Sequence, residues 1–114
     1  MSITEITVKN LNSAEKSRTF LDGSKRTVVI LGSVAIGRGK YLPDWKWSEH
    51  AGNQTGKNSE AHIGYIISGK MVVRGSDGEE VTVGSGDAFE VGPGHVARVV
   101  GSEPCVALDF ERLE

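Results

Sequence analysis

The sequence predicts an all-β sandwich or barrel, and two observations lead to that prediction. Glycine accounts for 15 of the 114 residues, about twice the usual share. The glycines separate short runs rich in valine, isoleucine and threonine, such as HIGYIIS, KMVVR and CVALDF. Short β-rich runs at near-regular spacing, with glycine turns between them, are typical of sandwiches and barrels.

The predicted strands follow one another along the whole chain. Gly69 and the Asp77–Gly78 pair are expected at the tips of two successive hairpins, and residues 10–21 are expected to hold at most a helical turn. No linker or change of composition divides the chain, so it is interpreted as a single domain over residues 1–114, with an amino-terminal strand and turn (1–25) and a barrel (about 26–111). The predicted strand runs are ITVK, RTVVILGSVAI, HIGYIIS, KMVVR, EVTV, DAFEV, HVARVV and CVALDF.

Charge and hydropathy give no sign of a nucleic-acid-binding, membrane-spanning or secreted protein. Thirteen basic and fifteen acidic residues leave a net charge of −2, which gives no electrostatic reason to expect nucleic acid or a membrane as partner. No apolar run approaches the roughly 20 residues of a membrane helix. The start, MSITEITVKN, lacks the features of a secretory signal, so we expect a cytoplasmic protein. Cys105, the single cysteine, is interpreted as a buried structural thiol.

Alternation along HIGYIIS places His62, Gly64 and Ile66 on one face of a strand. A glycine beside a histidine leaves space that a ligand or water could occupy, but it also relieves a tight bend, and both interpretations stay open. Phe89 and Val91 are expected to line the same interior as His62.

Three stretches together resemble the cupin superfamily: PDWKWSEH, AHIGYIISGKMVV and GDAFEVGPGHVARVVGSEPCVALDF. The resemblance covers roughly Val28 to Phe110 and is most specific where Gly86–Asp87 leads to Gly92–Pro93–Gly94. The chain looks like a small single-domain cupin with an RmlC-like jelly roll. The resemblance implies a double-stranded β-helix barrel, a small-molecule ligand, a divalent metal ion and a homodimer.

The metal ligands that the resemblance implies are carried over one position at a time. The family's first motif has a glutamate seven residues before its turn glycine; counting back from Gly69 reaches His62 instead. His50 is available for an upstream histidine position. The last ligand position of the second motif holds Ala97, and His95 lies two residues before it. The resemblance therefore implies a zinc, nickel or iron site at His50, His62 and His95.

Each ligand has a plainer interpretation as well. His62 could be a core histidine bound by a backbone carbonyl, His50 could lie on a solvated loop, and His95 could simply begin a strand after a turn. Glu49 or Glu60 could be a fourth ligand or only a solvated acid. Glu49 is our candidate for a catalytic general base.

Aromatic residues precede the histidines. Trp45 and Trp47 share one face if YLPDWKW is extended, and they line a ligand pocket, the core or a dimer interface. Trp47 is the preferred pocket residue because it leads directly to Glu49 and His50. The predicted substrate pocket comprises Trp47, Gly64, Phe89 and Ala97.

Two functions from different classes remain open, because one fold hosts both. Three convergent histidines would favour a metal-dependent oxygenase, isomerase or lyase. The alanine at position 97 favours a metal-free binding or sensor module. A third, weaker possibility is a structural partner that adds its amino-terminal strand or the RTVVILGSVAIG run to a neighbour's sheet.

Overall fold

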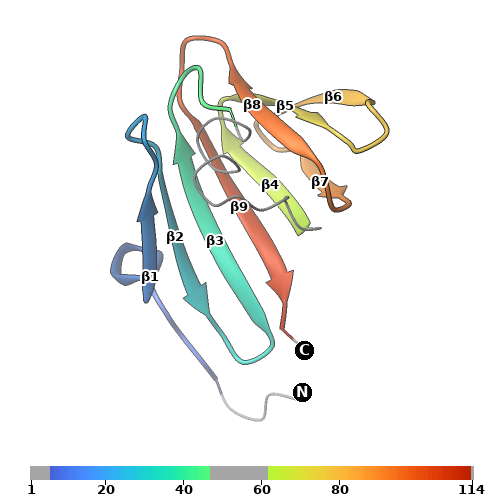
Figure 1. The fold of residues 1–114 in the computed structure, drawn as a ribbon. Helices are drawn as coiled ribbons and strands as arrows, with labels where there is room; N and C mark the ends of the chain where they lie inside the picture. Colours follow the sequence, from blue (N-terminus) through green and yellow to red (C-terminus); the bar gives the residue numbers. More distant parts are fainter. Residues whose placement is uncertain (1–5, 47–61, 114) are drawn as a thin grey trace.

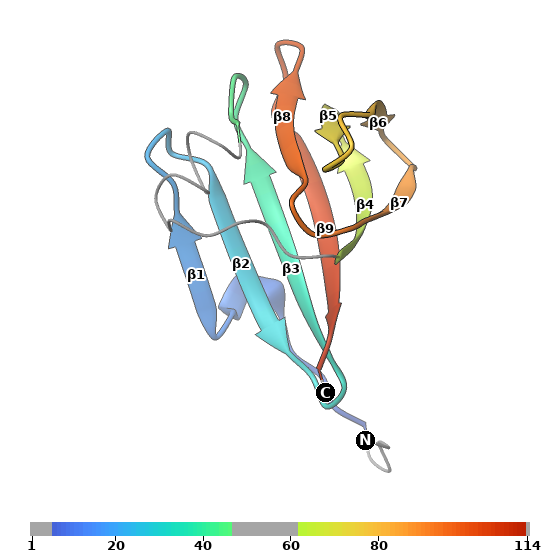
Figure 2. The same ribbon diagram turned by 45° about the vertical axis from the view of Figure 1, so that its right-hand side comes forward.

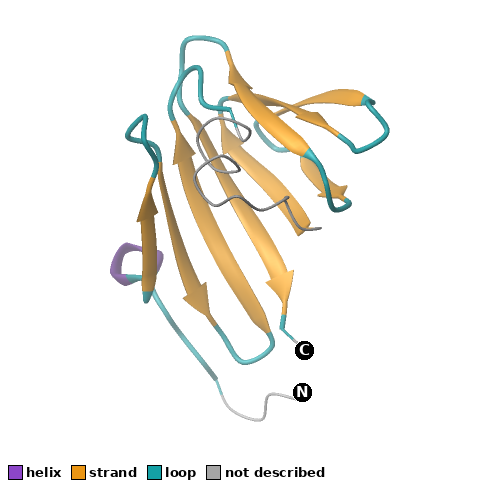
Figure 3. Ribbon diagram, in the orientation of Figure 1, coloured by secondary structure: helices purple, strands orange, loops and turns teal. Residues whose placement is uncertain are grey.

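The computed structural model describes residues 6–46 and 62–113, and within them the chain is built almost entirely of strands (Figures 1 and 3). The elements are η1 (Leu11–Ser13), β1 (Lys16–Thr19), β2 (Lys25–Ile30), β3 (Val34–Tyr41), β4 (His62–Ser68), β5 (Lys70–Arg74), β6 (Glu80–Gly84), β7 (Ala88–Val91), β8 (Val96–Val100) and β9 (Cys105–Arg112).

The strands form two antiparallel sheets. The larger sheet has the order β1-β2-β3-β9-β4-β7, and the smaller has the order β6-β5-β8. Figure 2 shows the last strand, β9, lying between β3 and β4. Its register with both neighbours joins residues far apart in sequence, for example Asp109 with Gly37 on one side and with Gly64 on the other. The all-β jelly-roll fold expected from the sequence is confirmed.

The chain passes from the larger sheet to the smaller one just after β3. The run YLPDWKW is not one extended strand, because a turn follows Tyr41 and Asp44 adopts a positive φ of 72°. Beyond the turn, the Val99 amide donates to the Trp45 carbonyl at 2.9 Å, and Lys46 forms a bridge to Arg98. Trp45 therefore lies against β8, at the edge of the smaller sheet.

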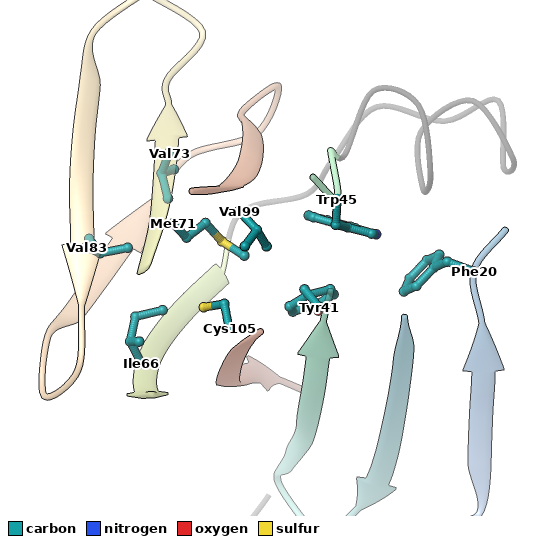
Figure 4. Packing of buried hydrophobic residues seen from close by; sticks show 9 residues of the cluster. All are labelled: Phe20, Tyr41, Trp45, Ile66, Met71, Val73, Val83, Val99 and Cys105. Carbon is teal, nitrogen blue, oxygen red and sulfur yellow. The ribbon is translucent and has the colours of Figure 1, made fainter. Parts of the chain in front are cut away.

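A hydrophobic core joins the two sheets (Figure 4). The Tyr41 and Trp45 rings lie 4.4 Å apart between centroids, and Phe20 packs edge-on against Trp45 at 5.8 Å. Apolar side chains from both sheets lose water contact here, which is the dominant favourable term in folding. The core cluster comprises Phe20, Tyr41, Trp45, Ile66, Met71, Val73, Val83, Val99 and Cys105.

One of the two predicted hairpins is confirmed. β5 and β6 pair directly, from Lys70 opposite Gly84 to Arg74 opposite Glu80. At the tip, Gly78 has a φ of 90°, a conformation that glycine adopts without steric cost.

The hairpin expected at Gly69 is wrong. β4 pairs with β7 and β9, whereas β5 pairs with β6 and β8, so Gly69 is a corner between the sheets. Its φ is 81°, and a β-carbon there would overlap the Pro104 carbonyl oxygen and lie 2.7 Å from the Cys105 α-carbon. The glycine allows the corner to pack against the start of β9.

The amino-terminal prediction is partly right. A helical turn forms at Leu11–Ser13, where the Asn10 side chain accepts a hydrogen bond from the Asn12 amide. The run ITVK is not a strand, however: residues 6–10 lie outside any strand. The polar segment Lys16–Thr19, which alternation does not single out, is a strand because it pairs with β2. The run RTVVILGSVAI divides into parts of β2 and β3.

Within the described part of the chain, no helix has the length and apolar character needed to cross a membrane.

Candidate functional site

The backbone at position 62 lies where β4 begins. His62 is in register with Val91, near the end of β7, so the start of one strand meets the end of its neighbour. The side chain of His62 lies outside the described residues. So do Trp47, Glu49, His50 and Glu60, and their predicted roles stay predictions.

His95 is buried at the turn before β8, with 6% of its surface exposed. Its Nδ1 lies 3.0 Å from the carbonyl oxygen of Gly92. A carbonyl only accepts hydrogen bonds, so Nδ1 is the donor in this bond. This bond makes His95 part of the turn and also fixes the orientation of its imidazole.

Metal ligation by described side chains is limited. Among them, which do not include those of His50 and His62, no group of three histidine, cysteine, aspartate or glutamate residues is placed to hold a metal ion. Of the three predicted ligands, His95 alone has a described side chain.

Gly64 and Phe89 meet across the pair of strands β4 and β7, where they are register partners. A β-carbon at Gly64 would lie 2.7 Å from Phe89 Cε1 and closer still to Cζ. An aromatic ring, rather than open space, therefore covers the α-carbon of Gly64. Phe89 and Val91 are partly buried against the core cluster, as expected for residues that line the interior.

Ala97 faces the core from the smaller sheet. It is in register with Val73 and is partly buried against the core cluster. A methyl group at this position supplies no metal ligand, so it forms an apolar part of the interior.

A polar pair crosses the inner face of the larger sheet. Arg26 Nη2 donates to Asp109 Oδ1 at 2.6 Å, and Arg26 Nε donates to Asp109 Oδ2 at 3.0 Å. This two-pronged geometry is the strong form of a guanidinium–carboxylate pair. The pair lies above Gly37, where a β-carbon would be 2.6 Å from both Nη2 and Oδ1.

The pKa of Arg26 reflects this pairing. Burial alone would lower the pKa of the guanidinium, but the hydrogen bond and the charge of Asp109 outweigh burial, so the net pKa is raised. Arg26 therefore stays positively charged although it is partly buried.

Tyr41 borders the same pair. Its ring covers Gly39, where any β-carbon would overlap ring atoms. Burial, followed by the charge of Asp109, raises the pKa of the Tyr41 hydroxyl, and an interaction with Arg26 acts in the opposite direction. Tyr41 is therefore a neutral hydroxyl beside the ion pair. Close by in the core, Trp45 Nε1 is buried with no hydrogen-bond partner among the described residues.

The sequence prediction missed the Arg26–Asp109 pair. A signal was present, because Asp109 alternates with Ala107 and Cys105 in CVALDF and therefore shares their inward face. An acid on the apolar face of a strand needs a partner. The identity of that partner follows from the sheet order, which the sequence does not reveal.

Cys105 is a buried structural thiol, as predicted. Burial raises the pKa of this thiol to about 11, which keeps it protonated and poorly nucleophilic near neutral pH.

The comparisons with known proteins agree on the fold. With a sugar phosphate isomerase of the cupin superfamily from Silicibacter pomeroyi, the chain shares a TM-score of 0.69 at 15% identity over 95% of this chain and 76% of that one. With an RmlC-like cupin from Shewanella frigidimarina, the TM-score is 0.67 at 14% identity, over 95% of this chain and 91% of that one. With KdgF from Halomonas sp., the TM-score is 0.63 at 19% identity, over 88% of each chain. Identities this low show likeness of fold alone.

No protein of curated function matches the sequence. The family model for the cupin domain matches residues 47–111, more than half of the chain. These residues include β4 to β8 and almost all of β9, and they contain the Gly92–Pro93–Gly94 turn with His95. The protein therefore belongs to the cupin domain family.

Proposed function

We propose that the protein binds a small molecule inside its barrel, at a divalent-metal site formed by His50, His62 and His95. One observation carries this proposal. Val91, the register partner of position 62, is followed directly by Gly92, whose carbonyl holds the imidazole of His95. The backbone of position 62 and the turn that holds His95 thus lie at the same end of β4 and β7, although they are 33 positions apart in the sequence, which supports a shared site.

The chemistry of the donor set fits such a metal ion. Neutral imidazole suits zinc, nickel and iron. A metal-bound histidine usually donates its other ring N–H to a carbonyl or carboxylate, and the Nδ1 of His95 makes a bond of this kind. The metal would supply Lewis-acid or oxygen-binding chemistry of the sort used by oxygenases and isomerases.

The remaining predicted residues complete the proposed site. Glu49 acts as the general base, taking a proton from the bound ligand. Trp47, Phe89 and Ala97 bound the ligand space, whereas Gly64 lies behind the ring of Phe89, which supplies the apolar wall there.

A second function has an observation in its favour. The position where the family usually has its last ligand holds Ala97, which packs against the core. If His95 is only the closing residue of its turn, the barrel is a metal-free binding or sensor module.

Elemental analysis tests the metal site. Untagged protein purified without chelator should contain close to one metal ion per chain, and His62→Ala should abolish it. His95→Asn is the sharper variant, because its side-chain amide can still donate to the Gly92 carbonyl while the Nε2 nitrogen is removed. We expect a folded protein that has lost its metal.

Glu80→Gln is the matched control, since Glu80 is an exposed residue of β6 that pairs with Arg98 at 3.1 Å. It should keep the metal content of the unmodified protein. If the unmodified protein takes up no zinc, nickel or iron on incubation, the metal site is refuted and the binding module is the better account.

Self-association is the second part of the proposal. Ile63, Tyr65 and Ile67 on the outer face of β4 are 49%, 39% and 43% exposed, and Ile63 and Tyr65 adjoin partly buried Phe110 and Leu108 of β9. An exposed apolar patch on a sheet commonly marks an interaction site.

The same chain carries a second exposed apolar feature. Ile6 and Val8 are 92% and 83% exposed on a segment that belongs to no strand. One chain thus supplies both an apolar sheet face and an apolar segment able to cover such a face, so a second copy is the proposed occupant and the protein is a homodimer.

A further inference from the structure

The ion pair between Arg26 and Asp109 is unusual for its place in the fold. It lies on the inner face of the larger sheet, where Asp109 is two residues from Ala107 and Arg26 is the register partner of Gly39. The Arg26 side chain is 33% exposed and that of Asp109 is 18% exposed. Both charged groups are therefore partly accessible to solvent.

The side chains around the pair lie flat on the sheet. Three inward-facing positions are glycines, and each is covered by a neighbour: Gly37 by the ion pair, Gly39 by the Tyr41 ring and Gly64 by the Phe89 ring. A side chain that takes the space of a missing β-carbon stays close to the backbone. No side chain projects from the glycines themselves, so the side chains that cover them lie close to the sheet. The polar groups of Arg26 and Asp109 are part of this layer.

Stability alone gives a weak reason for the pair. The pair is only partly removed from water, but even partial desolvation of two charges is unfavourable, and apolar residues of similar volume are often as stabilising or more so. Keeping a paired arginine and aspartate next to an apolar core is better explained by recognition of a ligand.

The hydrogen-bonding capacity of the pair defines the ligand. A guanidinium has five N–H donors, two of which are used on Asp109, so three remain for Tyr41 and a ligand. Each Asp109 oxygen keeps a lone pair. The site therefore offers donors and acceptors side by side with no net charge. A paired cation and anion give an ionic ligand little net electrostatic attraction, whereas adjacent hydroxyl groups can accept from Arg26 and donate to Asp109.

We propose that the Arg26–Asp109 pair is the recognition group for a neutral polyhydroxylated ligand of the sugar class, bound against the inner face of the larger sheet. The inference rests on the proposed small-molecule function and specifies its substrate class, but it does not require the metal.

Nuclear magnetic resonance on the labelled full chain tests this inference. D-glucose is the probe, and D-glucuronate, which adds a carboxylate, is its charged counterpart. We expect saturable millimolar shifts of the amide signals of Gly37, Gly39 and Gly64 with glucose, and weaker ones with glucuronate. Absence of saturable shifts with glucose, or stronger binding of glucuronate, would overturn the proposed ligand class.

Variants separate recognition from folding. The double variant Arg26→Met/Asp109→Leu should unfold at the same temperature as the unmodified chain or higher, yet lose the glucose shifts. Asp109→Asn, which keeps the shape of the side chain, should weaken glucose binding about tenfold or more. Glu80→Gln should bind normally. Glucose shifts that persist in the double variant, or an unchanged glucose affinity in Asp109→Asn, would refute the role of the pair.

Metal content measured on the same samples separates this inference from the proposed metal site. Glucose shifts without bound metal refute the metal site and support the ion pair as the recognition group. Bound metal without glucose shifts has the opposite meaning: the metal site stands and the sugar inference fails.

Discussion

The ring of Phe89 on β7 covers Gly64, its register partner on β4, and fills the space where a β-carbon at position 64 would lie. The contact joins an aromatic side chain to a bare stretch of backbone, the arrangement by which an aromatic residue compensates for a glycine in a sheet. It also explains the glycine locally: any larger residue at position 64 forces the ring of Phe89 out of its place against the core.

Gly64→Ala should therefore destabilise the protein by about 1–3 kcal/mol, the usual cost of overpacking. The cost should be much smaller in a Phe89→Ala background, because the ring that the new methyl group meets is gone. Urea unfolding of the two single variants and the double variant gives the coupling free energy. Additive costs would mean that Phe89 is not what restricts position 64.

Gly69→Ala and Gly78→Ala form a matched pair, because both glycines have a positive φ, of 81° and 90°. A β-carbon at Gly78 meets nothing within 4 Å, whereas one at Gly69 overlaps the Pro104 backbone. We expect about 1–2 kcal/mol of destabilisation at Gly78 from the backbone conformation alone. At Gly69 we expect about 2–5 kcal/mol of destabilisation, because overlap with rigid backbone adds to the cost of the backbone conformation. Equal thermal shifts would refute the corner described at Gly69.

The raised pKa of the Cys105 thiol predicts that the protein loses stability at alkaline pH. The pKa of this thiol is raised from an ordinary value of 9.0 to about 11 in the folded protein. Below the unfolded pKa, both states hold the proton and the contribution to stability is fully present. Between the two pKa values the unfolded thiol ionises while the folded one does not, so the free energy of unfolding should fall by up to about 1.4 kcal/mol per pH unit.

Urea unfolding at a series of pH values from about 8 to 9.5 measures this slope below the pKa of about 10 that tyrosine has in the unfolded chain. Cys105→Ala should be less stable at every pH because of its smaller side chain, but its stability should vary less with pH. An unchanged slope would show that another group causes the alkaline loss.

The proposed homodimer predicts the mass of the protein in solution. Light scattering after size exclusion should give twice the chain mass of 12.2 kDa. Ile63→Ser/Ile67→Ser should shift the mass toward that of one chain, because it removes apolar area from the outer face of β4. Val81→Ser, at a valine of β6 that is 52% exposed, should not. A monomeric unmodified protein would refute the dimer.

Local sequence patterns predicted most of the strands. HIGYIIS and KMVVR coincide with β4 and β5 residue for residue, because both combine β-branched residues with flanking turn residues. The strand at Lys16–Thr19 was missed because its residues are polar, and only the pairing with β2 makes it a strand. At Gly69 the glycine turn was predicted but not its geometry, since a hairpin and a corner between sheets use the same left-handed residue.

By itself, the sequence determined the all-β class, the resemblance to cupins, the buried thiol and the region of the chain that holds the histidines. These properties depend on composition and on alternation over a few residues. Only the tertiary structure decided that β9 lies between β3 and β4, and hence that Asp109 meets Arg26 over Gly37. The two charged residues are 83 positions apart. Their contact depends on strand order and register, which the packing of the whole chain selects and no local pattern encodes.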